Sequence, residues 1–340
     1  MTAEPGLHTP LCDLLGCRYP ILQAGMGGVA RAELVSAVSD AGGYGFLGMV
    51  REQPEVISRE IDAVRERTDQ PFGANLIPAA TDRSLLDEEL AVCFEKRVHS
   101  MCFFWDVDQN VVMRAKRARC LVLYQVGSVE AAVAAERAGA DIIIGQGFEA
   151  GGHVRGVVSS LVLLPQLVEA VSIPVVASGG FASGEGLVAA LALGAQGIHC
   201  GTVFLATEES FAHEFHKRRV VAASSEDTVY TDLFAINWPP ESPVRVIRNS
   251  ITEDKSVKLR GNDPGNLPRE MIAEEDGRPI YKFSTDSPLR STRGNLEALP
   301  AFAGQVAGLI ASVPKAADLI AEMAQSAARA LDRLKAIRTV

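Results

Sequence analysis

The residues best suited to do chemistry gather in one short stretch, GQGFEAGGHVRG, at positions 145–156. It places a carboxylate (Glu149), an imidazole (His153) and a guanidinium (Arg155) among five glycines. Glycine loses more backbone freedom on folding than any other residue, so such a run needs a reason, and close approach of the backbone to a ligand is one. An imidazole titrates near neutral pH and can exchange a proton with a bound molecule. The stretch therefore predicts a catalytic proton-transfer group at His153. For Glu149 and Arg155, a loop-stabilising salt bridge and a contact with substrate are both open.

The elements that must position this stretch form a regular series. Eight short β-rich apolar runs alternate with segments of helical periodicity. The runs cover residues 19–26, 44–49, 72–77, 100–105, 120–126, 141–147, 174–180 and 197–205. The helix ends carry glycines typical of C-caps and serines typical of N-caps: Gly42, Gly139, Gly194, Ser128 and Ser183. Several runs are continuously apolar, as parallel strands buried on both faces are. The pattern predicts an α/β fold, a closed (β/α)8 TIM barrel, with an open doubly wound sheet as the alternative.

The alternation of predicted strands and helices stops after residue 205. Residues 206–224 are typical of a helix, whereas residues 225–294 are rich in Pro, Asp, Asn and Arg and predict a smaller irregular or helical cap. The tail is strongly helical with a break at Pro314, and we expect it to pack back on the barrel.

The chain thus divides into two predicted units. Residues 1–222 form the barrel, which the C-terminal helices of residues 295–340 complete, and residues 223–294 form a smaller cap or substrate domain.

The working groups of such a barrel come from the C-terminal ends of its strands. In strand order, the predicted ends present Gln23, Ala24, Gly25 and Met26; Asn75; Gln125; Gln146; Ser178, Gly179 and Gly180; and Gly201 and Thr202. Loops after the seventh and eighth strands commonly bind phosphate, because glycines let backbone N–H groups approach the anion. The side-chain amides of Asn75, Gln125 and Gln146 suit the polar edge of a heteroaromatic ring. Flavin mononucleotide (FMN) would use both features, with Met26 against its ring.

Charge and hydropathy exclude other classes of protein. The net charge of −9, the pI near 5.3 and the lack of a basic stripe argue against a nucleic-acid partner. The longest apolar stretches are too short to span a bilayer, and the first residues do not resemble a signal peptide. We therefore expect a cytoplasmic protein without a membrane partner, and a homodimer stays an open alternative.

The cysteines and histidines do not form a metal-binding pattern. The six cysteines include no C-x-x-C pair, so reduced and mostly buried thiols are expected. The sequence HEFH carries His213 and His216 three residues apart, one short of the H-E-x-x-H zinc motif. We expect these two imidazoles on a helix surface and no metal site.

These motifs resemble those of a known family, the nitronate monooxygenases, formerly called 2-nitropropane dioxygenases. The related FMN-dependent enoyl-acyl-carrier-protein reductases of the second type are also similar. QGFEAGGHVRG matches the family's Q-G-x-E-A-G-G-H signature, and PILQAGMGG, GGYGFLG, PFGANL and VVASGGFASGEG add to the likeness. The similarity covers roughly residues 10–215 and continues more weakly beyond them.

The resemblance implies an FMN-dependent oxidoreductase with no metal. A nitronate, or a neutral nitroalkane, would be oxidised by O2 to a carbonyl compound and nitrite, with His153 as the base or orienting group. The residues expected to bind FMN are those of the strand ends together with Ala150, Gly151 and Gly152 of the glycine-rich stretch.

Two departures from the family pattern bear on the substrate. Many members have proline at the position of Gly25, and the glycine of this chain is closer to the pattern of the carrier-protein reductases. Val203 replaces an arginine that the family often has after the eighth strand. One alternative is therefore an NAD(P)H-dependent FMN reductase acting on quinones or enoyl thioesters. Another, from a different class, is a non-catalytic module that binds flavin or another ligand.

Overall fold

Eight parallel strands close into a barrel in the computed structural model, which describes residues 7–337. The strands are β1 (Ile21–Gln23), β2 (Tyr44–Gly48), β3 (Gly73–Leu76), β4 (Ser100–Phe104), β5 (Leu121–Val126), β6 (Ile142–Gln146), β8 (Val175–Ser178) and β9 (Ile198–Cys200). Strand β9 pairs with β1, with His199 opposite Leu22, and this pairing closes the sheet. The predicted (β/α)8 barrel is confirmed, and the open sheet is wrong. Residues 1–6 and 338–340 of the predicted barrel unit lie outside the described residues.

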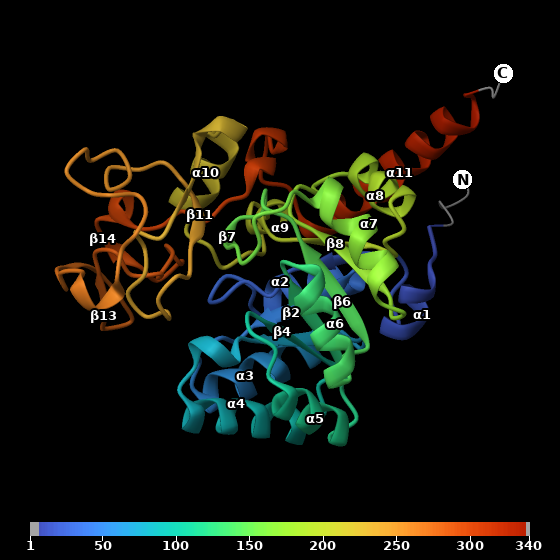
Figure 1. Ribbon diagram of the computed structural model, residues 1–340, viewed down its shortest axis with the longest axis horizontal. Helices are drawn as coiled ribbons and strands as arrows, with labels where there is room; N and C mark the ends of the chain where they lie inside the picture. Colours follow the sequence, from blue (N-terminus) through green and yellow to red (C-terminus); the bar gives the residue numbers. More distant parts are fainter. Residues whose placement is uncertain (1–6, 338–340) are drawn as a thin grey trace.

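Helices cover the outer face of the barrel (Figure 1). They are α2 (Ala32–Asp40), α3 (Pro54–Arg65), α4 (Arg83–Glu95), α5 (Gln109–Arg117), α6 (Val129–Ala138), α7 (Ser160–Ala170) and α8 (Gly184–Ala192). The Ser128 and Ser183 hydroxyls accept from N–H groups in the first turns of α6 and α8, as expected of N-caps. One predicted strand was too long: the run 197–205 ends as a strand at Cys200, and Thr202–Leu205 is the short helix α9.

Large apolar side chains fill the inside of the barrel. Tyr44, Phe46 and Leu123 are fully buried there, in one cluster with Leu11 and Leu15 of α1 (Pro10–Leu15). The interior is therefore a packed core, and room for a ligand is left only at the C-terminal ends of the strands.

Residues 225–294, all of them described, contain no α-helix. An antiparallel sheet joins β10 (Thr228–Thr231), β11 (Val244–Ile247) and the two-residue strand β7 (Gly152–His153). A second sheet joins β13 (Arg278–Tyr281), β12 (Met271–Glu275) and β14 (Arg293–Gly294). The expected cap is thus built from small sheets and irregular loops, and its helical alternative is wrong. Figure 1 shows it as an orange lobe beside the barrel.

The segment 206–224 is helical only in its second half, as α10 (Glu214–Ala222). In the first half, the carbonyls of Glu208, Glu209 and Ser210 accept from the Arg290 guanidinium instead of from helix N–H groups. His216 is fully buried and bonds to the carbonyl oxygen of Phe302, so its expected place on the helix surface is wrong.

The C-terminal tail contains one α-helix, α11 (Ala316–Lys335), which packs on α8 and α2. The Ser326 hydroxyl accepts from the N–H of Gly184, the first residue of α8. The segment before Pro314 was expected to be helical, but it forms only short 3-10 turns, at Leu296–Ala298 and Gln305–Leu309. A Cβ on Gly151 would lie 2.3 Å from the Gly304 nitrogen, so this irregular segment runs directly beneath the glycine-rich stretch.

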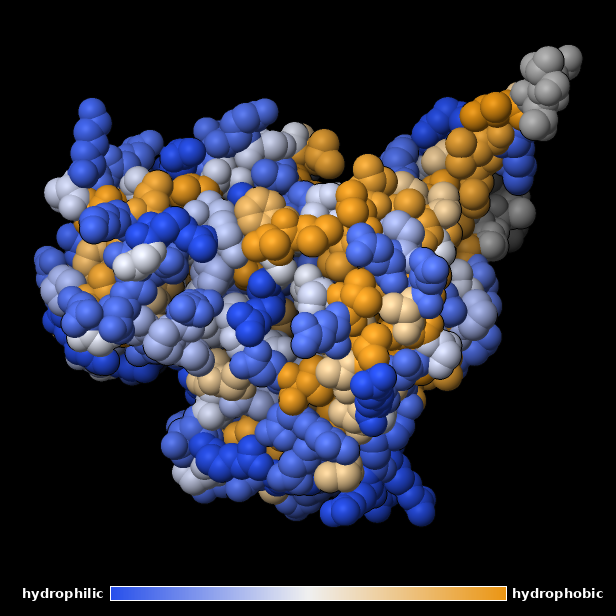
Figure 2. Space-filling view, in the orientation of Figure 1, coloured by the Kyte–Doolittle hydropathy of each residue, from blue (hydrophilic) through white to orange (hydrophobic). Residues whose placement is uncertain are grey.

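The six cysteines are buried free thiols, as expected. Figure 2 shows hydrophobic residues gathered on the side of the barrel that carries α7 and α8, and Val157, Leu161 and Val162 are exposed there. Among residues 7–337, no helix is both long enough and apolar enough to cross a membrane.

Candidate active site

The backbone of His153 is fixed from two sides. In β7 it pairs with Val244 of the cap strand β11. From the barrel, the Gln146 side-chain amide at the end of β6 donates to the His153 carbonyl oxygen at 2.9 Å. The glycine-rich stretch thus leaves the barrel and adds a strand to the cap, which places His153 at the junction of the two.

Aromatic rings surround the imidazole of His153. The Trp238 indole is stacked on it, with ring centroids 3.3 Å apart. Trp105 meets it edge-on at 5.9 Å, and Phe302 lies at 6.2 Å. Both imidazole nitrogens are buried, and neither makes a hydrogen bond of good geometry within residues 7–337; the backbone of Ser242 acts on the ring only as a weak partner. Because these aromatic rings exclude water from the imidazole, they favour its uncharged form.

The pKa of His153 is lowered well below its ordinary value. Burial is the main cause, the nearby positive charge of Arg51 is the second, and the backbone at Ser242 opposes them only in part. His153 is therefore a neutral imidazole at neutral pH, with a free lone pair able to accept a proton.

A cavity of about 1120 Å³ opens at the C-terminal mouth of the barrel. Its walls include His153 and all but one of the residues predicted to bind the cofactor: Ala24, Gly25, Met26, Asn75, Gln125, Gln146, Ala150, Gly151, Gly152, Ser178, Gly179, Gly180, Gly201 and Thr202. A volume above the usual range of ligand pockets has room for a cofactor and a substrate together.

Gln23 is the exception. Its side chain is fully buried, and its amide exchanges hydrogen bonds with the backbone N–H and C=O of Phe46 in β2, each at 3.2 Å. The side chain bridges two barrel strands below the cavity, so we leave Gln23 out of the proposed cofactor contacts.

The loop after β8 has the properties of an anion cradle. Gly179 and Gly180 have φ values of +79° and +90°, a backbone conformation that favours glycine. A Cβ on Gly179 would lie 2.8 Å from the Gly147 carbonyl oxygen. Among the described residues, neither N–H donates to another group, so both are available to a phosphate.

Glu149 and Arg155 both stabilise the loop and do not line the cavity. The Glu149 carboxylate accepts from the Ser160 N–H and hydroxyl, each at 3.0 Å, and so caps α7. Arg155 forms an ion pair with Asp106 at 2.9 Å and lies over the Trp105 ring. The structure therefore favours a loop-stabilising role for both, although they do not pair with each other.

Several residues of the site escaped the sequence analysis. Trp105 and Trp238 contact His153, and the charge of Arg51 acts on it from across the cavity. The buried Arg245 of β11 donates to the carbonyls of Phe148 and Ala150. The signal available for Trp238 was weak: it is one of only two tryptophans and stands before Pro239 and Pro240.

His199 is a further residue that sequence reasoning missed. Its Nδ1 lies 3.1 Å from the Ser178 hydroxyl, and its buried Nε2 has no partner among the described residues. His199 stands between two apolar residues of β9, as a polar residue of an ordinary strand does. Its sequence context therefore did not mark it as a site residue.

A closed barrel whose mouth combines a large cavity, an anion cradle and a neutral buried imidazole defines an enzyme of the (β/α)8 class. The sequence model of the family described as nitronate monooxygenase matches residues 8–326, and the chain belongs to this family. It is accordingly an enzyme, an FMN-dependent oxidoreductase, and the alternative of a non-catalytic module is wrong.

Curated relatives carry two kinds of name. A probable nitronate monooxygenase of Staphylococcus haemolyticus is 34% identical over 76% of this chain and 82% of its own. A (3aS,4S,5R,7aS)-5-hydroxy-7a-methyl-1-oxo-octahydro-1H-indene-4-carboxyl-CoA dehydrogenase of Mycobacterium tuberculosis is 32% identical over 92% and 94%.

Two solved structures are similar over nearly the whole chain. FabK from Thermotoga maritima superimposes with a TM-score of 0.81 at 31% identity, covering 96% of this chain and 98% of its own. Nitroalkane oxidase from Streptomyces ansochromogenes gives a TM-score of 0.79 at 31% identity, covering 96% and 100%.

Proposed function

We propose that this protein oxidises alkyl nitronates, and the neutral nitroalkanes from which they form, with O2 to a carbonyl compound and nitrite. The observation that carries the proposal is the neutral, unpartnered imidazole of His153 on the wall of the cavity. Membership of the nitronate monooxygenase family and the likeness to a nitroalkane oxidase support it.

The cavity residues fit FMN. The free N–H groups of Gly179 and Gly180 would bind its phosphate, and Met26 and Gly152 would lie beside its ring. Gly152 has φ +69° with open space where a Cβ would be, which leaves a flat surface for a ring system. When bound, FMN would supply the electron acceptor that the side chains of this protein lack.

His153 would act on the substrate carbon. With a neutral nitroalkane, the imidazole takes the α-proton, the C–H electron pair forms the C=N bond, and the negative charge moves to the nitro oxygens. With a nitronate this proton is already gone, so the same imidazole only orients the anion. The aromatic rings around it keep water away from the transferred proton.

Residues 223–294 would act as the substrate domain. They contribute Asn237, Trp238 and Thr285 to the wall of the cavity facing the barrel mouth. Substrate size and shape would therefore be selected by the cap.

A second candidate function is the oxidoreduction of a coenzyme A thioester. The cavity continues from the mouth to Arg59 and Arg67 of the α3 region and to Asp276 of the cap, farther than a small nitronate needs. The carboxyl-CoA dehydrogenases among the relatives, 32% and 31% identical, agree with a longer substrate.

Anaerobic bleaching of the flavin distinguishes the two candidates. The purified holoenzyme is mixed in parallel with propyl-2-nitronate, NADH, NADPH and a coenzyme A thioester, and its visible absorbance is followed. Rapid bleaching by the nitronate supports the proposed function. Bleaching by NADH, NADPH or the thioester without bleaching by the nitronate would transfer the assignment to the second candidate.

A further inference from the structure

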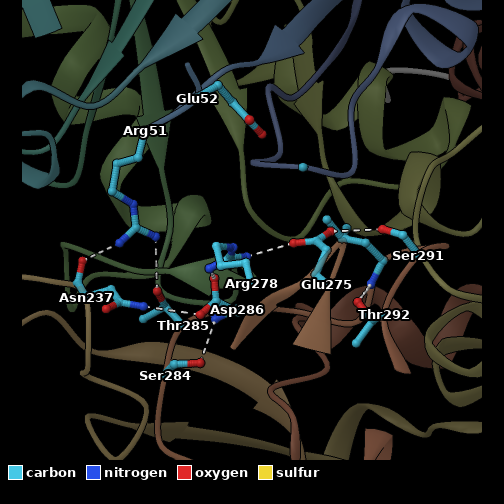
Figure 3. A network of polar contacts seen from close by, with 12 residues as sticks. Arg51, Glu52, Asn237, Glu275, Arg278, Ser284, Thr285, Asp286, Ser291 and Thr292 are labelled. Atoms are coloured by element: carbon cyan, nitrogen blue, oxygen red, sulfur yellow. Dashed lines mark hydrogen bonds and ion pairs between the residues drawn. The ribbon is translucent and has the colours of Figure 1, made fainter. Parts of the chain in front are cut away.

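Arg51 stands across the barrel mouth from the loop that carries His153. It follows β2, which is four strands from β6 in either direction around the closed sheet. Both residues line the same cavity. Figure 3 shows Arg51 reaching from the barrel toward the cap, where its guanidinium donates to the Asn237 carbonyl at 2.5 Å and to the Thr285 hydroxyl at 3.4 Å. Asn237 directly precedes Trp238, whose ring is stacked on His153. The guanidinium is therefore hydrogen-bonded to the residue next to that tryptophan.

The charge of Arg51 is not neutralised by contact. Arg278 pairs with Glu275 at 2.7 Å and with Asp286 at 3.0 Å (Figure 3), whereas Arg51 contacts only neutral oxygens. No carboxylate of residues 7–337 forms an ion pair with it.

The other acids near Arg51 are also engaged or uncharged. Glu52 pairs with Arg31 at 2.7 Å. Glu89 is fully buried, and burial raises its pKa to about 8, so it is mostly protonated at neutral pH. Arginine stays charged in proteins. This half-buried guanidinium therefore offers a bound anion a positive charge that no ion pair within residues 7–337 neutralises.

Backbone strain gathers at the same place. Arg51 has φ +60°, Trp105 +83° and Asn237 +78°, a left-handed conformation that residues with side chains rarely adopt. Strained conformations persist where the surrounding structure enforces them, and they cluster at ligand sites. Two of these residues, Arg51 and Asn237, line the cavity, and Trp105 packs against His153 on its wall.

We propose that Arg51 forms an anion subsite opposite His153, which binds the two oxygens of a planar anion. Guanidinium groups match such oxygens with two parallel N–H donors. As His153 removes the α-proton, negative charge develops on the nitro oxygens, and a fixed cation stabilises that charge. The identity of the anion as a nitronate rests on the proposed function, whereas the preference of the subsite for a planar anion does not.

Binding of an unreactive anion tests the subsite directly. The holoenzyme is titrated with propionate and with its neutral analogue propionamide, and tryptophan fluorescence is read. The protein has two tryptophans, Trp105 and Trp238, and both contact His153. Arg51→Met removes the charge, Arg51→Lys keeps it, and Arg117→Met is the control, an exposed arginine of α5 that does not line the cavity.

We expect Arg51→Met to weaken propionate binding about tenfold or more and to leave propionamide binding within about twofold, as loss of a charged hydrogen bond implies. Arg51→Lys should fall between, and Arg117→Met should match the wild type. Equal binding of propionate by Arg51→Met and wild type would overturn the subsite. So would wild-type binding that is equally tight for propionamide, or no saturable binding of propionate, and these two results do not depend on whether a variant folds.

Turnover separates this inference from the proposed function. If the wild type oxidises propyl-2-nitronate and Arg51→Met has an unchanged KM, the subsite fails and the function stands. If the wild type oxidises no nitronate but propionate binding still depends on Arg51, the function fails and the subsite stands.

Discussion

The Trp238 indole lies on the His153 imidazole, with ring centroids 3.3 Å apart and an angle of 21° between the planes. The two residues come from different parts of the protein, His153 from the loop after β6 and Trp238 from the cap. Their contact means that the environment of the proposed base is completed by the cap and not by the barrel alone.

Removing this ring should change the titration of His153. In the wild type, kcat/KM with a neutral nitroalkane should stay level as pH falls through 6.5, because the buried imidazole stays neutral there. Trp238→Ala admits water, so the pKa should rise and the acidic limb of the profile should move up toward about 6.5. Trp238→Phe keeps an aromatic ring and should retain most of the wild-type profile. Identical profiles for the alanine variant and the wild type would contradict a role of Trp238 in holding the base neutral.

Replacing the base should separate two substrates. His153→Ala should lower kcat/KM for 2-nitropropane about 10²- to 10⁴-fold, the usual contribution of general base catalysis. The loss should be much smaller for the nitronate of the same compound, because its α-proton is already absent. His213→Asn is the control, because asparagine can still serve as the N-cap of α10 and this N-cap lies away from the cavity. An equal loss for both substrates would show that His153 serves in binding rather than in proton removal.

The proposed contact of Gly152 with FMN can be tested against a matched glycine. Gly152 and Gly277 have φ values of +69° and +82°, and both have open space around a Cβ, but only Gly152 lines the cavity. Each substitution by alanine should cost about 1 kcal/mol or somewhat more through the left-handed backbone. Only Gly152→Ala should also weaken FMN binding, measured as the ratio of flavin to protein and by titration of the apoprotein. Equal FMN affinity in the two variants would remove Gly152 from the cofactor site.

His216 should make the fold sensitive to mild acid. Burial lowers its pKa to about 4, whereas the unfolded chain binds this proton near 6.5. Between these values only the unfolded state gains the proton, so stability is lost as pH falls, by about 3 kcal/mol from this group. His216→Gln should flatten the pH dependence of the free energy of unfolding over that window, measured by urea denaturation. At pH 8 neither state takes the proton, so the slopes of the two proteins should agree there.

Much of the barrel and of the cavity at its mouth could be predicted from the sequence. Apolar runs and capping serines are local signals, and they placed all eight strands and the ends of helices such as α6 and α8. Because every strand of such a barrel ends at the same rim, residues as distant in sequence as Met26, Gln125 and Ser178 could be assigned to one cavity. The buried Gln23 shows the limit of that rule, since side chains along a strand alternate in direction.

What the sequence by itself determined is the barrel, its glycine-rich rim and the position of His153, since each depends on short-range patterns. Only the tertiary structure decided the surroundings of that histidine. Trp238 lies 85 residues beyond it, and the Arg51 bond to Asn237 spans 186 positions. The sheets of the cap, the capping role of Glu149 and the free charge of Arg51 likewise depend on which distant groups are neighbours. Long-range packing produces no periodic pattern in the sequence, so these parts of the site could be identified only from the folded structure.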